Sequence, residues 1–135
     1  MLKVNGELRD IQSADGFATL TREWDKGDQI ELQLPMEVRR VTAHEKITEN
    51  QGKVALEYGP LVYCAEGADN AEGFTEGGIS PMTEFTLSSR EDFLQGAVTL
   101  REKNPAPGHA ARVFIPYYAW SNRGVNSMKL WFTKL

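Results

Sequence analysis

Hydrophobic and polar residues alternate most regularly between Asp28 and Arg39. Apolar side chains stand at every second position there, at residues 30, 32, 34, 36 and 38. A period of two places them on one face of a β-strand, so the pattern predicts a strand over residues 28–39. Proline has no backbone N–H to donate to a neighbouring strand, and Pro35 therefore indicates an edge strand or a β-bulge.

The preceding segment, residues 16–24, predicts the partner strand of a hairpin. Ala18, Leu20 and Trp24 share one face with Arg22, and Phe17 lies on the other face. The link Asp25–Asp28 is expected to form a tight turn, because Gly27 takes a positive φ at little cost. If Arg22 points inward it needs an acidic partner, since an unpaired buried charge is costly.

Further short apolar segments predict strands along the rest of the chain. Residues 53–58 alternate, and the almost wholly apolar run 61–65 is typical of a strand buried on both faces. Additional strands are predicted at 84–87, 97–101, 112–120 and 127–135, after a glycine-rich loop over 67–82. The expected fold class is all-β, an antiparallel, jelly-roll-like β-sandwich, either alone or as one complete sandwich plus part of a second.

Length and charge narrow the function classes. A chain of 135 residues with 41% hydrophobic and 25% charged residues suits one globular domain. Its net charge of −4 argues against nucleic acid or an anionic membrane as a partner. The sequence contains no apolar run of transmembrane length and no apolar stretch of signal-peptide length at its start, and it leaves the compartment unknown.

The supply of reactive side chains is small. One cysteine excludes an internal disulfide and a cysteine-based zinc site formed by this chain alone. The two histidines, His44 and His109, are far apart and lack metal-ligand spacing. These counts argue against a self-sufficient enzyme.

Three blocks of sequence together point to a family. They are GFATLTREW at 16–24 followed by LQLPM at 32–36, then GKVAL at 52–56 followed by GPLVYCAE at 59–66, and IPYYAW at 115–120 followed by NRG at 122–124. In order and spacing these blocks resemble the C-terminal region of glycoside hydrolase family 127, the β-L-arabinofuranosidase family. The resemblance spans nearly the whole chain, although residues 71–111 carry little of it.

The resemblance implies a much longer parent protein. Members of this family have an (α/α)6-barrel catalytic domain, which holds a cysteine nucleophile, a glutamate and a zinc ion, followed by two β-sandwiches. In the family, one sandwich is inserted into the other. The resemblance therefore implies that residues 1–40 and 112–135 belong to an outer sandwich and residues 41–111 to an inserted one. No residue here matches the catalytic positions, so neither a catalytic residue nor a cofactor is expected in this chain, and its expected partner is the barrel. The chain looks like the end of such an enzyme.

An aromatic group is the most interesting candidate site. Tyr117, Tyr118 and Trp120 precede Asn122 and Arg123. Sugars stack on aromatic rings, and amide and guanidinium groups bind sugar hydroxyls, so these residues form a candidate carbohydrate-binding platform. The alternative is core packing or docking onto the barrel, because aromatic residues dominate small cores. In a strand, Tyr118 and Trp120 would lie on the side opposite to Tyr117.

Other candidates have simpler interpretations. Cys64 lies in an apolar strand and is expected to be buried and inert. Asp25 and Asp28 are better explained by turn formation than by paired-carboxylate catalysis. Four oxygen-bearing side chains could bind calcium, but they fit no EF-hand spacing and more simply form a solvated acidic loop: Asp69, Asn70, Glu72 and Glu76.

The sequence therefore predicts a non-catalytic β-sandwich region of a glycoside hydrolase. The resemblance implies that the parent hydrolyses terminal β-L-arabinofuranosyl residues with retention. Its expected role is to support the barrel and to contribute to a homo-oligomer. Two alternatives stay open, a carbohydrate-binding module and a self-sufficient enzyme.

Overall fold

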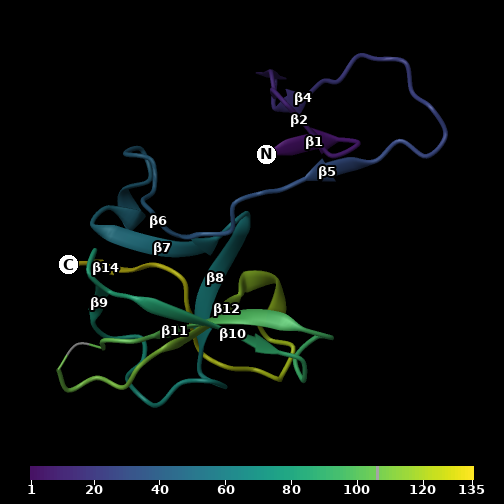
Figure 1. Cartoon of the computed structure of the whole chain (residues 1–135). Helices are drawn as coiled ribbons and strands as arrows, with labels where there is room; N and C mark the ends of the chain where they lie inside the picture. The colour runs from purple at the N-terminus through teal and green to yellow at the C-terminus, as the bar shows by residue number, and fades with distance from the viewer. Residues whose placement is uncertain (106) are drawn as a thin grey trace. The chain divides into compact units, whose positions relative to one another are not determined.

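The chain divides into two compact units, Met1–Pro35 and Met36–Leu135. A computed structural model describes residues 1–105 and 107–135 (Figure 1). Within this described part, two short 3-10 helices are the only helical elements, and the remaining regular structure is strand. The predicted all-β fold is confirmed. No helix in the described ranges is long and apolar enough to span a membrane.

The first unit contains five short strands. These are β1 (Leu2–Val4), β2 (Glu7–Arg9), β3 (Ser13–Ala14), β4 (Phe17–Ala18) and β5 (Ile30–Leu32). Strand β1 lies between β2 and β5 in an antiparallel sheet, and β3 and β4 form a separate hairpin. Leu2 and Val4 are its buried hydrophobic residues. A sheet this small buries little apolar surface of its own.

The expected hairpin of residues 16–24 with 28–39 is wrong. Strand β5 pairs with β1 instead, with Leu2 opposite Leu32 and Val4 opposite Ile30. The long predicted strand is also split, because β5 ends at Leu32 and the next strand begins only at Val38, after Pro35. Alternation identified the strand-forming residues, but it carries no information about which distant strand supplies the hydrogen bonds.

The second unit contains the other nine strands and both 3-10 helices. The strands are β6 (Val38–Val41), β7 (Lys53–Tyr58), β8 (Leu61–Glu66), β9 (Gly78–Ile79), β10 (Phe85–Arg90), β11 (Ala97–Glu102), β12 (Val113–Pro116), β13 (Met128–Lys129) and β14 (Phe132–Lys134). The 3-10 helices are η1 (Thr48–Asn50) and η2 (Tyr117–Ala119). All nine strands join one mixed sheet, and among the described residues only the β9–β14 pair is parallel.

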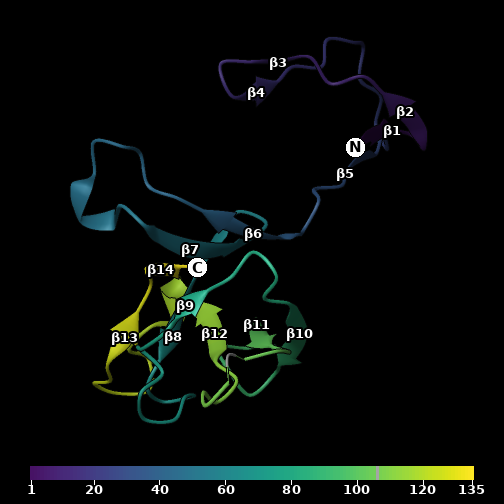
Figure 2. The same ribbon diagram turned by 90° about the vertical axis from the view of Figure 1, so that its left-hand side faces the viewer.

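Strand β8 is the centre of this sheet. It pairs with β7 through a two-residue turn at Gly59 and Pro60, with β12, and near its end with β13. Figure 2 shows β12, β11 and β10 following one another beside β8. Gly59 has φ of 56°, a left-handed conformation that glycine adopts without strain, so the turn favours glycine at this position.

Two hydrophobic clusters lie on opposite faces of β8. Tyr63 and Ala65 belong to the larger cluster, together with Phe114 and Phe132. Cys64, between them in sequence, belongs to the smaller cluster, which also contains Phe93, Ala97, Ile115 and Ala119. Side chains alternate along a strand, so both faces of β8 are covered at residues 63–65. The predicted burial on both faces is confirmed for these three residues, while Leu61 is half-buried and Val62 is 36% exposed.

The predicted strands near the C-terminus are shorter than expected. Strand β12 ends at Pro116, and the chain then turns into η2 instead of continuing to Trp120. The predicted strand 127–135 is divided into β13 and β14. Residues 112–135 pair with β7 and β8 inside the second unit. The assignment of 1–40 and 112–135 to an outer sandwich, with 41–111 inserted, stays a prediction about the parent's domains.

Candidate functional site

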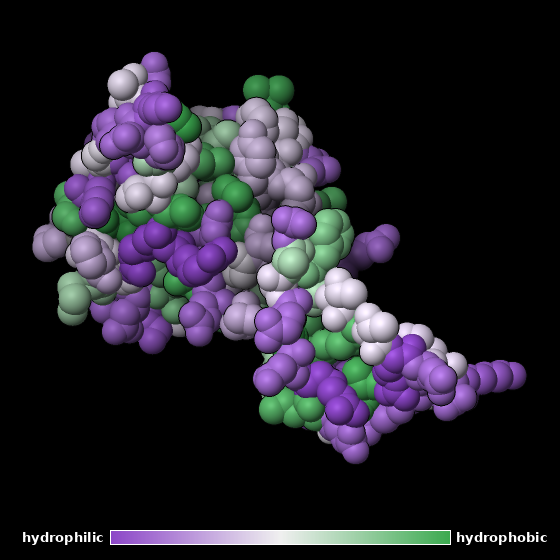
Figure 3. Space-filling view, turned by 90° about the horizontal axis from the view of Figure 1, so that it is seen from above, coloured by the Kyte–Doolittle hydropathy of each residue, from purple (hydrophilic) through white to green (hydrophobic). Residues whose placement is uncertain are grey.

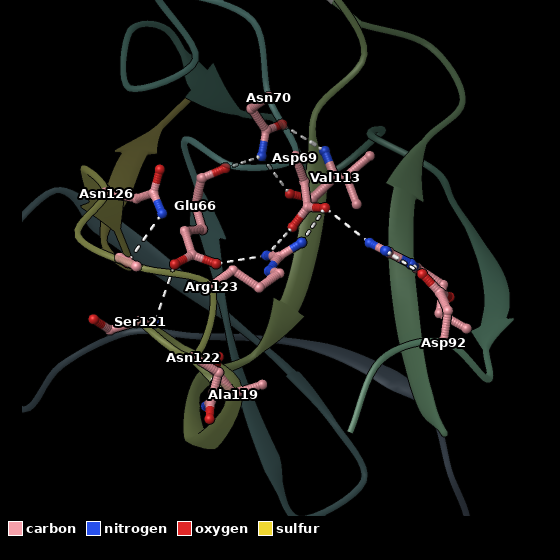
Figure 4. Close-up of polar contacts among 12 residues, drawn as sticks. Glu66, Asp69, Asn70, Asp92, Val113, Ala119, Ser121, Asn122, Arg123 and Asn126 are labelled. Carbon is pink, nitrogen blue, oxygen red and sulfur yellow. Dashed lines mark hydrogen bonds and ion pairs between the residues drawn. The ribbon is translucent and has the colours of Figure 1, made fainter. Parts of the chain in front are cut away.

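A cluster of charged side chains ties the end of β8 to a turn near the C-terminus (Figure 4). The Arg123 guanidinium donates to Glu66 Oε2 at 2.6 Å and, through its second nitrogen, to Asp69 Oδ1 at 2.7 Å. Asp69 also accepts a hydrogen bond from Arg90, which comes from β10 and binds Asp92 as well. The cluster therefore joins three segments that are distant in sequence.

The cluster is strongly shielded from solvent at its centre. Glu66 is 0% exposed, and the side chain of Asp69 is 9% exposed. Hydrogen bonding to Arg123, reinforced by the charges of Arg123 and Arg90, lowers the pKa of Asp69 below its usual range. The same two carboxylates raise the pKa of Arg123. The charged forms of both Asp69 and Arg123 are thus stabilised by the ion pair.

Asn70 connects the charged cluster to β12 through hydrogen bonds. Its amide nitrogen donates to the backbone oxygens of Glu66 at 2.8 Å and Val113 at 2.9 Å, and its amide oxygen accepts from the Val113 N–H at 2.8 Å. The side chain thereby takes the place of a strand neighbour at the start of β12. Neither predicted role for this residue, in a calcium site or a solvated loop, describes this arrangement.

The predicted platform residues form a turn held by this cluster. Tyr117 and Tyr118 lie in η2 and Trp120 follows it. The Tyr117 and Trp120 rings stack with centroids 6.0 Å apart at 17°, because residues three apart share a face of a 3-10 helix. The expectation that Trp120 lies opposite to Tyr117 is therefore wrong. All three aromatic residues are exposed, at 40–58%.

The polar members of the predicted platform donate to acceptors within the protein, although the buried Nε of Arg123 has no hydrogen-bond partner. The Asn122 amide nitrogen donates to the Ala119 backbone oxygen at 3.1 Å, and Arg123 binds Glu66 and Asp69. The structure thus brings the five residues into one turn, with the aromatic rings outward and the guanidinium inward. Carbohydrate binding by these residues stays a prediction.

Cys64 is buried, as predicted. It is 0% exposed, and burial, reinforced by the Glu66 charge, raises the pKa of its thiol to about 12. The thiolate that a nucleophile requires is therefore disfavoured at neutral pH.

The interpretation of Asp25 and Asp28 as turn residues is confirmed. The Asp28 N–H donates to the Asp25 backbone oxygen at 3.1 Å, and an Asp28 carboxylate oxygen accepts from the Asp25 N–H at 3.0 Å. Hydrogen bonds from Asn5 and from the Asp25 backbone lower the pKa of Asp28. Arg22 is exposed and lies 3.3 Å from Asp28, so it has an acidic partner without being inward.

The glycine-rich loop borders a small hollow. Its volume is about 190 Å³, and its lining includes Glu72, Glu76, Glu102, His109 and Arg112. Glu72, Glu76 and His109 are exposed, while Glu102 at the base is buried and bound by Arg112 at 2.6 Å. Among the described residues, no group of three or more His, Cys, Asp or Glu side chains could hold a metal ion.

Sequence reasoning missed several residues of the charged cluster. The local pattern gives no charged partner to Glu66 or Arg90, and it places Asp69 in a loop without its arginine partners. The one available signal was a glutamate at the end of an almost wholly apolar strand, which required a cationic partner if buried. The partner itself lies 57 residues away, so no local pattern reveals it.

Comparison with protein families matches both units separately. The family described as "Glycoside hydrolase family 127 C-terminal domain" matches residues 38–133. The one described as "Beta-L-arabinofuranosidase, GH127 middle domain" matches residues 1–36. The first match ends at residue 36 and the second begins at residue 38, close to the division between the compact units at residues 35 and 36.

Individual relatives agree with this assignment. A non-reducing end β-L-arabinofuranosidase of Bifidobacterium longum subsp. longum is 29% identical over 96% of this chain and 23% of its own length. A solved GH127 β-L-arabinofuranosidase from Geobacillus stearothermophilus T6 is 31% identical with a TM-score of 0.86, over 99% of this chain and 24% of that one. A second solved GH127 β-arabinofuranosidase is 30% identical with a TM-score of 0.85, over 99% of this chain and 23% of that one.

The chain thus spans about a quarter of the length of these relatives. Both the matched domain descriptions and the fold agree with the resemblance found in the sequence. The chain belongs to glycoside hydrolase family 127, with residues 1–36 matching its middle domain and residues 38–133 its C-terminal domain.

Proposed function

We propose that this chain is a non-catalytic accessory region of a glycoside hydrolase that removes terminal β-L-arabinofuranosyl residues. Its role is to stabilise the catalytic barrel of the longer parent protein and to contribute to its oligomeric assembly. The substrate class is taken from the printed names of the relatives, which are β-L-arabinofuranosidases. The zinc ion that the family resemblance implies would be bound by that barrel.

One observation carries the non-catalytic assignment. The most deeply buried carboxylates, those of Glu66, Asp69 and Glu102, are each bound to an arginine. A general acid of a glycosidase needs a raised pKa and access to the leaving-group oxygen. The pKa of Asp69 is lowered instead, and both carboxylate oxygens of Glu102 face Arg112. These acids stabilise the fold.

The thiol supports the same conclusion. Cys64 is enclosed by Phe93, Ala97, Ile115 and Ala119 in the smaller hydrophobic cluster. With its pKa raised to about 12 and no exposed surface, it cannot attack an anomeric carbon.

The test is an activity comparison on an aryl β-L-arabinofuranoside with zinc present. The purified 135-residue chain should show no turnover above buffer, while the parent polypeptide, meaning the longer chain that carries these residues, should be active. Deleting residues 36–135 from the parent should lower its melting temperature. Turnover by the 135-residue chain would overturn the non-catalytic assignment, and a parent unaffected by the deletion would overturn the supporting role.

A further inference from the structure

The surface at residues 117–128, here called the aromatic turn, differs from the rest of the molecule. It exposes Tyr117, Tyr118 and Trp120 by 43%, 58% and 40%, and Val125 is fully exposed. Apolar side chains occur elsewhere at the surface, where Figure 3 shows green groups between purple ones. The aromatic turn, however, gathers three large rings within four residues.

The aromatic turn carries no uncompensated charge. Arg123 is its one charged residue in the sequence, in a chain where charged residues make up 25%. That guanidinium is bound by Glu66 and Asp69, which come from outside the turn. Protein interfaces are depleted of charged residues at their centre and enriched in Tyr and Trp.

The aromatic turn is also held rigidly. Glu66 accepts a hydrogen bond from the Ser121 N–H at 3.0 Å in addition to that from Arg123. Ser121 has φ of 65°, a conformation that residues other than glycine adopt at a cost. Ala119, between the rings, is fully buried in the smaller hydrophobic cluster. A rigid surface loses little conformational entropy when a partner binds.

We propose that the aromatic turn is the docking surface for an uncharged, apolar protein surface in the rest of the parent polypeptide, and that the buried Glu66–Arg123 pair positions it. This rests on the proposed accessory function. The relatives are about four times as long as this chain, so a large part of the parent lies beyond these residues. Three exposed rings on a neutral, pre-organised turn are suited to contact with an apolar surface in the remainder of the parent polypeptide.

A protein partner explains the geometry better than a sugar does. Sugar recognition needs open ring faces and free donors for hydroxyl groups. The Tyr117 and Trp120 rings instead stack on each other with centroids 6.0 Å apart, and the Asn122 amide nitrogen and two Arg123 guanidinium nitrogens donate within the protein. Val125, two residues after Arg123 in sequence, is fully exposed, and its apolar side chain forms no hydrogen bond with a hydroxyl group.

Hydroxyl-radical footprinting read by mass spectrometry tests the proposal. The 135-residue chain and the parent polypeptide are oxidised under the same conditions. Tyr117, Tyr118 and Trp120 should be oxidised about fivefold more slowly in the parent, because docking removes most of their exposed surface. Met82, which is 82% exposed and lies outside the aromatic turn, is the internal control and should react equally in both.

A pair of variants separates docking from a packing role. Tyr117→Ser combined with Trp120→Ser should leave the melting temperature of the 135-residue chain nearly unchanged and lower that of the parent by several degrees. Phe114→Leu, in the core at 0% exposure, should lower both. Glu66→Gln should restore part of the oxidation of Trp120 in the parent, because it weakens the hold on Ser121 and Arg123.

The outcomes distinguish this proposal from the accessory function on which it rests. Equal oxidation of the rings in chain and parent would overturn the docking surface, while a parent destabilised by deletion of 36–135 would still support the accessory function. Protection of the rings in the 135-residue chain by a millimolar arabinose-containing oligosaccharide would overturn the proposal in favour of a sugar site. Loss of stability in the isolated double variant would show that the rings are structural.

Discussion

Arg112 and Glu102 form a two-point ion pair inside the second unit, with Arg112 Nη2 2.6 Å from Glu102 Oε1 and Nε 3.0 Å from Oε2. The side chains are 10% and 3% exposed. Arg112 also donates to the Gly78 backbone oxygen at 2.8 Å, and its guanidinium lies over the Phe132 ring at 4.8 Å. The Arg112 side chain thus contacts β11, β9 and β14, and it lies against Phe132 of the larger hydrophobic cluster.

Glu102→Gln should destabilise the chain by about 3 kcal/mol, because it leaves the Arg112 charge buried without a counter-charge. Urea unfolding followed by circular dichroism measures the loss. Glu84→Gln is the matched control: Glu84 pairs with Lys103 at 3.3 Å on the exposed surface, so its loss should cost below about 1 kcal/mol. Equal effects of the two substitutions would contradict the importance of burial.

Cys64 should resist thiol reagents in the native chain at neutral pH. Its pKa is raised to about 12 and its surface is fully covered, so reaction requires unfolding. A disulfide reagent should label less than a tenth of the native protein in the time that labels all of it in concentrated urea. Rapid, complete labelling of the native chain would show that β8 opens or that the smaller cluster is not formed.

The Asp69 carboxylate should make stability depend on pH in the acid range. Its folded pKa lies below the unfolded value of about 3.9, because Arg123 and Arg90 stabilise the charged form. The stabilisation is therefore complete above the unfolded pKa and is lost as the pH falls through the folded pKa. Melting curves between pH 7 and pH 2 should show this loss in the natural sequence.

Asp69→Asn should lower the melting temperature at pH 7 and flatten the acid dependence, since the substituted side chain has no charge to lose. Glu72→Gln, at an exposed position of the same loop, should leave both unchanged and is the control. An acid profile of Asp69→Asn that parallels the natural one would place the titrating group elsewhere.

Residues 36–135 should fold without the first unit. Both hydrophobic clusters lie entirely within this range, whereas the first unit buries Leu2 and Val4 alone among its hydrophobic residues. The shortened chain should unfold cooperatively in urea, and a peptide of residues 1–35 should lack a fixed structure. A disordered 36–135 fragment would refute this division of stability.

The first unit should also make the chain associate. Its exposed large hydrophobic residues are Met1, Leu8, Ile11, Phe17, Trp24, Ile30, Leu32 and Leu34. Exposed apolar surface and unpaired strand edges promote self-association. Sedimentation velocity should show concentration-dependent association of residues 1–135 that residues 36–135 lack, and a strictly monomeric full chain at high concentration would argue against it.

The strands whose assignment succeeded are those with local signals. Residues 53–58 and 61–65 became β7 and β8, because alternation and the Gly59–Pro60 turn act over a few residues. The wrong predictions concern strand pairing between segments that are distant in sequence and the point at which a strand ends. Residues 16–24 and 28–39 both contain strand, but β5 pairs with β1, and this depends on a strand that precedes both segments. The strand expected over 112–120 ends at Pro116, where the chain winds into η2.

The sequence by itself determined the all-β class, the burial of Cys64 and the family, because alternation, apolar runs and short motifs are local properties of the chain. The tertiary structure alone decided which charges meet. Arg123 reaches Glu66 and Asp69 across 57 and 54 residues, and Arg112 reaches Glu102 across ten. Such pairs form only when strand order brings their positions together. Burial then determines how much the loss of one partner destabilises the fold. A buried charge without its partner is costly, whereas a charge at the surface is solvated by water.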